Sequence, residues 1–207
     1  MNIKQIIWQV ILTFAVVTQL HSQITGEYLY QKNCAVCHGN QLRGNLPQFP
    51  SIIDIGSRMN KNEVQELLKT GKGLMPSFKH ISNSERQAIT DFLFGEDSTS
   101  EQQTETTVAE LGKSLFIANC AACHKVKEDD PQPKEQRDWG RIPKILGGIN
   151  SLHSQETFVY YLNMGPCYMP SFEEMKDEDK SAIYHYLSSF EKIGETESDN
   201  CQMGCNH

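Results

Sequence analysis

The feature that constrains this chain most is a short cysteine–histidine motif that occurs twice. It has the form C-x-x-C-H and reads CAVCH at residues 34–38 and CAACH at residues 120–124, 86 positions later. This spacing is the signature of covalent haem attachment, in which two cysteines form thioethers with the porphyrin and the histidine ligates the iron. The candidate haem-binding residues are therefore Cys34, Cys37, His38, Cys120, Cys123 and His124.

The sequence after each motif offers a second axial ligand. Both halves contain the pattern G-x-x-x-M-P-S-F, at residues 71–78 and 165–172, which places a methionine at Met75 and at Met169. A thioether is soft and neutral, so histidine–methionine ligation favours ferrous iron, raises the reduction potential and fills both axial positions. The commoner fate of a methionine is a core position, and we expect that for Met164, which lacks the Pro-Ser-Phe sequel.

The two halves repeat beyond these motifs. Gly26 and Tyr30 recur as Gly112 and Phe116 at an offset of 86 residues, whereas the two methionines are 94 residues apart. The second half therefore carries about eight extra residues, which we place mostly in the polar stretch 125–138. Such self-similarity indicates an internal duplication, with one structural unit in each half.

Each unit is predicted to be a small all-α domain. The pattern Ser82 to Glu85 is typical of a capping box and predicts a helix that begins at Ser82 and ends before Gly95. Aromatic residues at matching places (Tyr30 with Phe92, Phe116 with Tyr186) predict where first and last helices cross. The other helices are expected at residues 25–33, 61–70, 108–119, 154–163 and 177–191.

The N-terminal residues 1–22 have the three parts of a secretory signal peptide, with Lys4, an apolar run over residues 6–17 and a polar end. The run is shorter than the roughly 20 residues that a membrane span needs. We expect a periplasmic or otherwise exported protein, because covalent haem attachment takes place outside the bacterial cytoplasm. The predicted divisions are a signal peptide at 1–22, domains at 23–95 and 108–193, an acidic Ser/Thr-rich flexible linker at 96–107, and a cysteine-containing tail at 194–207.

Over nearly all of both units the chain resembles class I cytochrome c, and two such domains in tandem resemble dihaem cytochromes of the c4 type. The resemblance implies two covalently bound haem c groups, each wrapped by one domain. It also implies that the carbonyls of Pro50 and Pro143 accept a hydrogen bond from the proximal histidines, which would fix each imidazole tautomer. The segment around each methionine is also similar to cytochrome domains that accompany pyrroloquinoline-quinone-dependent dehydrogenases.

These features predict an electron carrier without enzyme activity, working between a dehydrogenase or membrane redox complex and a terminal acceptor. The expected partners are redox proteins such as a quinoprotein dehydrogenase, a cytochrome complex or an oxidase, with membrane contact only through them. A net charge of −7 without a Lys/Arg cluster argues against nucleic acid. The alternatives are a haem enzyme such as a dihaem peroxidase, which needs an open or displaceable axial position, and a zinc site assembled from both motifs.

Three further cysteines remain, Cys167, Cys201 and Cys205. In an exported protein their default fate is a disulfide, either from Cys167 to the tail or between Cys201 and Cys205. The tail also offers soft ligands suited to copper. The histidines outside the motifs are expected at the surface or in loops, at His80, His153 and His185.

Overall fold

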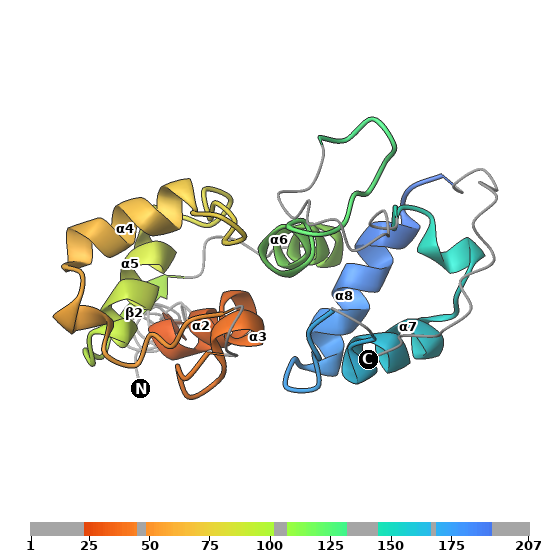
Figure 1. Cartoon of the computed structure of the whole chain (residues 1–207). Helices are drawn as coiled ribbons and strands as arrows, with labels where there is room; N and C mark the ends of the chain where they lie inside the picture. The colour runs from red at the N-terminus through yellow and green to blue at the C-terminus, as the bar shows by residue number, and fades with distance from the viewer. Residues whose placement is uncertain (1–22, 45–48, 102–106, 132–144, 167–168, 192–207) are drawn as a thin grey trace, which may run out of the picture.

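The computed structural model describes residues 23–44, 49–101, 107–131, 145–166 and 169–191, and this part of the chain is mostly helical. The predicted all-α class is confirmed. The first unit contains α2 (Gly26–Asn33), α3 (Ala35–His38), the 3-10 turn η1 (Ile55–Ser57), α4 (Lys61–Thr70) and α5 (Asn83–Leu93). The second contains α6 (Val108–Asn119), η2 (Ile149–Ser151), α7 (Gln155–Met164) and α8 (Asp177–Ser188). Figure 1 shows the two units beside each other, with α6 of the second unit next to the first.

The helices begin where the sequence supplies capping side chains. At α5 the Ser82 N–H donates to the Glu85 carboxylate at 2.7 Å, and the Glu85 N–H donates to Ser82 Oγ at 3.2 Å. This reciprocal pair satisfies donors that have no partner within the helix. The predicted capping box is therefore confirmed, and the same arrangement begins α4 at Asn60 and α6 at Thr107.

In each unit the first and last helices cross at a glycine. A Cβ atom on Gly26 would lie 2.1 Å from the Ala88 carbonyl oxygen, and one on Gly112 would lie 2.0 Å from that of Ala182. Since no side chain fits at these distances, glycine is what permits the two backbones to approach so closely. The predicted aromatic pairs lie at the same crossings, with ring centroids 5.4 Å apart for Tyr30 and Phe92 and 5.9 Å apart for Phe116 and Tyr186.

Each unit packs its helices around its own hydrophobic core. Both cores contain the first cysteine of the motif, and both Cys34 and Cys120 are buried. The core of the first unit includes Leu29, Tyr30, Val64, Leu68 and Ile89, and that of the second includes Leu115, Phe116, Phe158, Leu162, Ile183 and Leu187.

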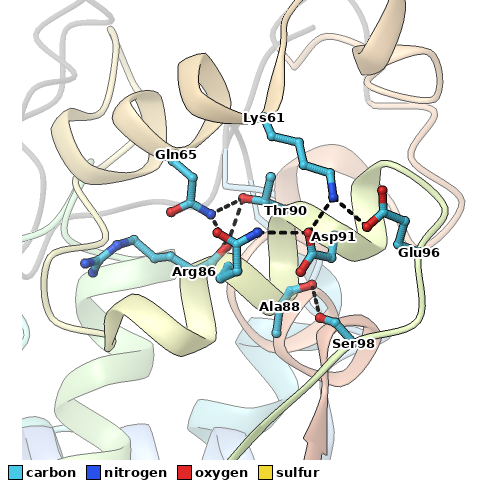
Figure 2. Close-up of polar contacts among 9 residues, drawn as sticks. Lys61, Gln65, Arg86, Ala88, Thr90, Asp91, Glu96 and Ser98 are labelled. Atoms are coloured by element: carbon cyan, nitrogen blue, oxygen red, sulfur yellow. Dashed lines mark hydrogen bonds and ion pairs between the residues drawn. The ribbon is translucent and has the colours of Figure 1, made fainter.

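Part of the predicted flexible linker 96–107 has regular structure, which differs from our expectation. Strand β2 (Thr99–Glu101) pairs antiparallel with β1 (Gln23–Thr25), and Ser100 is 2% exposed. Close to this strand, Ser98 Oγ donates to the Ala88 carbonyl at 3.4 Å, and Glu96 forms an ion pair with Lys61 (Figure 2). The start of the connection is thus held against α4 and α5 by polar contacts that its composition did not reveal.

The remaining helix predictions are close to the structure, although α8 ends at Ser188, three residues before the expected end at Glu191. Among the described residues no helix combines the length and the apolar character needed to cross a bilayer. The expected signal peptide 1–22, residues 132–138 of the expected polar loop and the tail 194–207 lie outside the described residues.

Candidate haem sites

The first C-x-x-C-H motif begins at Cys34, directly after α2, and continues through the single turn α3. The backbone N–H groups of Cys37 and His38 both donate to the Cys34 carbonyl, at 3.1 and 2.9 Å. The second motif repeats this turn, with the N–H groups of Cys123 and His124 donating to the Cys120 carbonyl at 3.0 and 2.9 Å. Equal spacing in the sequence therefore accompanies the same pair of backbone hydrogen bonds in both units, although only residues 35–38 form a helical turn.

The two leading cysteines are neutral core residues. Cys34 and Cys120 are each 8% exposed. Burial, followed by the effect of Cys37, raises the pKa of Cys34 to about 12, and burial, followed by the effects of Cys123 and Cys37, raises that of Cys120 to about 12. A protonated thiol carries no charge into the apolar core, and a thioether at the same position would carry none either.

The proximal imidazole of the first unit is oriented by a backbone carbonyl. His38 Nδ1 lies 3.0 Å from the Pro50 carbonyl oxygen. Because a carbonyl only accepts, Nδ1 carries the hydrogen and Nε2 keeps the lone pair that a metal ligand needs. Burial lowers the pKa of His38, which favours this neutral form. The bond is the one that the resemblance implied for Pro50, while Pro143 lies outside the described residues.

Met75 and Met169 each pack against the core of their own unit, the same core that contains the motif cysteine. The Ser that follows each methionine in the MPSF pattern ties its loop to the preceding helix. Ser77 Oγ donates to the Lys69 carbonyl, and Ser171 Oγ donates to the Asn163 carbonyl, both at 2.7 Å. The repeated serine thus anchors the methionine loop to α4 in the first unit and to α7 in the second.

A buried cation near the start of each last helix was missed by the sequence analysis. Arg86 is 7% exposed, and its guanidinium donates to the Phe78 carbonyl at 2.9 Å and also to the Ile81 carbonyl. Lys180 occupies the equivalent position, 94 residues later, and is 2% exposed. The sequence did contain a signal for these two residues, because they are 94 positions apart, as the two methionines are. Their burial is unusual, since isolated Arg and Lys residues are rarely buried.

One expectation about side-chain environment is wrong. Met164 is 43% exposed at the end of α7, so it is not a core residue. His80 and His153 lie half-buried in a turn and a loop, and His185 is exposed, as predicted. The His80 ring lies 5.8 Å from that of Phe78, and burial lowers its pKa. The cysteines for which we considered disulfides or copper, Cys167, Cys201 and Cys205, lie outside the described residues.

The donors of each unit suit a covalent haem better than a lone metal ion. Within the described residues no group of three or more His, Cys, Asp or Glu side chains could hold a metal ion, so the zinc alternative has no ligand cluster there. Each unit instead presents two thiols, an imidazole and a thioether, which are the groups that attach haem and fill its axial positions. In the first unit His38 also has the tautomer that iron ligation requires.

A helical unit that carries C-x-x-C-H behind its first helix and M-P after a middle helix defines a c-type cytochrome domain, and this chain contains two. Residues 22–93 and 107–187 match the family described as cytochrome C oxidase, cbb3-type, subunit III. The chain belongs to this family of electron-transfer cytochromes, in which haem c is bound covalently.

Individual relatives match either one unit or both. Cytochrome c6 of Chlorolobion braunii is 36% identical over 73 residues, 35% of this chain and 78% of the relative. Cytochrome c-551 of Bacillus subtilis is 35% identical over 51 residues, 25% of this chain and 44% of the relative. The cytochrome bc1 complex cytochrome c subunit of Corynebacterium diphtheriae is 25% identical over 194 residues, 79% of this chain and 65% of the relative. The matches to the last two therefore span less than two thirds of those proteins.

Proposed function

We propose that this chain is an exported dihaem c-type cytochrome that carries electrons between a dehydrogenase or membrane redox complex and a terminal acceptor. The observation that supports it best is the duplication of the whole donor set, each copy on its own helical core. The proposed domains extend over residues 23–95 and 108–193, with one haem c in each.

In this proposal the residues of the first unit divide the work of holding one haem. Cys34 and Cys37 would bind it covalently, and His38 would offer Nε2 to the iron because the Pro50 carbonyl accepts its Nδ1–H at 3.0 Å. Met75 would offer its thioether from a loop that Ser77 fixes to α4. When bound, haem supplies a one-electron ferric/ferrous couple.

The second unit is assigned the same roles through Cys120, Cys123, His124 and Met169. Because a methionine thioether would be available to the iron in each unit, neither site would keep the open coordination place that a peroxidase needs, so we propose a carrier and not an enzyme. Pro143 is proposed to orient His124 as Pro50 orients His38.

The partner proposal rests on the family and on charge. The family is named for a subunit of cbb3-type oxidase, and one relative is a subunit of the bc1 complex, so we propose a membrane redox complex or a dehydrogenase as partner. A net charge of −7 would favour a basic docking face on that partner.

A haem count on the mature protein tests the proposal. Chain expressed with an export and cytochrome-maturation system should give two haems per polypeptide in a pyridine haemochrome assay. Its ferric form should show a methionine–iron band at about 700 nm, a property of such ligation. Cys37→Ser should lower the count to one, whereas the matched Cys201→Ser, outside both motifs, should leave it at two. A chain without covalent haem would contradict the proposal.

A further inference from the structure

We propose that Lys32 and Asp179 are positioning residues that hold the two haem-attachment segments against each other, so that electrons pass directly between the two units. This inference rests on the proposed function, in which each unit carries one covalent haem. It concerns the contact between the units, which neither the motifs nor the linker composition determines.

The central contact is an ion pair with little access to water. Lys32 Nζ lies 3.1 Å from Asp179 Oδ1, and the two side chains are 14% and 8% exposed. Lys32 belongs to the last turn of α2 in the first unit, and Asp179 to the first turn of α8 in the second. Each charge therefore also lies at the helix end whose dipole favours it. Removal of either partner would leave a buried charge uncompensated, which is costly.

Further contacts surround this pair and come from both units. The Tyr28 ring of α2 has Lys32 Nζ 4.9 Å from its centroid on its own helix and Lys176 Nζ, at the start of α8, 5.2 Å from the same centroid. The Asn119 side-chain amide donates to the Lys32 carbonyl at 3.1 Å, and that of Asn40 donates to the Glu174 carboxylate at 2.8 Å. Polar contacts of this number and spread oppose both rotation and separation of the units.

The apolar part of the contact brings the two motifs together. Val36, inside the first C-x-x-C-H motif, packs against the core of the second unit, and Ala118 of α6 belongs to the core of the first. The two segments in which haem would be attached therefore lie at the contact between the units.

This placement determines a function because electron tunnelling weakens steeply with distance. In the proposed exchange one electron leaves the ferrous iron of one unit, which becomes ferric, and reduces the ferric iron of the other. No bond forms or breaks, and no external oxidant takes part. A fixed contact keeps the gap short in every molecule, whereas freely moving units would have a short gap only part of the time.

The first unit provides a matched control for the ion pair. Lys61 Nζ lies 2.7 Å from Asp91 Oδ1 and 2.6 Å from Glu96 Oε2 (Figure 2). This lysine is therefore also paired, but both carboxylates come before the second unit in the chain. Lys61→Ala therefore removes a comparable charge pair without touching the contact between the units.

The test uses the dihaem holoprotein and variants Asp179→Ala, Lys32→Ala and Lys61→Ala. A pulse that reduces about one haem per molecule starts the electron exchange. Absorbance then follows the exchange at several protein concentrations. Small-angle X-ray scattering measures the radius of gyration of the same variants. We expect a concentration-independent exchange in the parent protein, slowed about tenfold in the Asp179 and Lys32 variants as the close arrangement loses population. Lys61→Ala should keep the parent rate, and Lys32→Arg, which retains the charge, should keep most of it.

The outcomes separate the two proposals. Fewer than two haems in the parent protein would contradict the proposed function itself. Two haems with an unchanged exchange rate and radius of gyration in Asp179→Ala would overturn the positioning role. If Asp179→Ala does not fold, the milder Asp179→Asn, which keeps the side-chain shape and removes the charge, replaces it with the same expected direction.

Discussion

Replacement of Gly112 by alanine should destabilise the second unit, because this position lies where α6 crosses α8. The added Cβ would lie 2.0 Å from the Ala182 carbonyl oxygen and 2.8 Å from Tyr186 Cβ. Non-bonded heavy atoms are most stable at about 3.5 Å, so the two helices would have to separate by about 1.5 Å. The obstacle is backbone, which has no rotamer to change, so the strain has to spread into the crossing.

The magnitude follows from two opposing terms. Alanine is favoured over glycine inside a helix by about 1 kcal/mol. Overpacking in a well-packed core costs about 1–3 kcal/mol, and separation would also weaken the Phe116–Tyr186 ring contact, which lies at 5.9 Å and is worth about 1 kcal/mol. The net loss is about 2 kcal/mol, which corresponds to about 10 °C in the melting temperature of a unit this small.

Thermal unfolding of the holoprotein, followed by far-ultraviolet circular dichroism and by haem absorbance, measures this loss. Gly56→Ala is the matched control, because its Cβ would meet only the Phe94 ring at 3.4 Å, an ordinary contact. Gly26→Ala, with 2.1 Å to the Ala88 carbonyl, should destabilise the first unit by a similar amount. The reasoning about the crossing is refuted if Gly112→Ala melts at the same temperature as Gly56→Ala.

Three further predictions concern the first unit. Met75→His should lower one of two reduction potentials by roughly 0.1 V or more in a redox titration, since the axial ligand sets the potential, and two unchanged potentials would contradict the ligand assignment. Arg86→Leu should cost about 3 kcal/mol in denaturant unfolding and weaken the methionine–iron band, because two buried carbonyls of the methionine loop lose their donor; an unaltered band would argue against a role for Arg86 in holding that loop. Burial acts to raise the pKa of Asp91, but hydrogen bonds, first that of Lys61, leave it below its ordinary 3.8. This lowered pKa stabilises the fold above pH 3.8, and the stabilisation is lost as the pH falls through the pKa that Asp91 has in the folded protein. Asp91→Asn should therefore show a smaller loss of stability than the parent protein below about pH 4 in acid titrations. An acid titration identical to that of the parent protein would count against this ion pair.

Most of the residues that the sequence identified correctly share a physical property: their roles are set by neighbours within one or two helical turns. A capping box needs only Ser82 and Glu85, three positions apart. The turn of each C-x-x-C-H motif needs only its own five residues. The crossing aromatics could also be predicted, because the duplication shows each pair twice and so separates pattern from chance.

The features that the sequence did not reveal join segments far apart in the chain. Strand β2 was read as flexible linker because its composition is polar, yet it pairs with β1, which lies more than 70 residues earlier. Met164 was expected in the core because methionine is apolar, but its position after the last buried turn of α7 leaves it exposed. Composition describes what a side chain prefers, and the tertiary environment decides whether the preference is met.

The sequence by itself determined that this chain carries two related helical units, each with a C-x-x-C-H motif and a later M-P-S-F segment. Covalent attachment needs the two cysteines and the histidine within one short stretch, so the motif is visible in the sequence. The tertiary structure alone decided how the units meet. Lys32 and Asp179 are 147 positions apart, and their 3.1 Å ion pair follows from the packing of α2 against the second unit. Long-range complementarity of this kind leaves no periodic pattern in the sequence, since any exposed Lys and Asp would look the same before the chain folds.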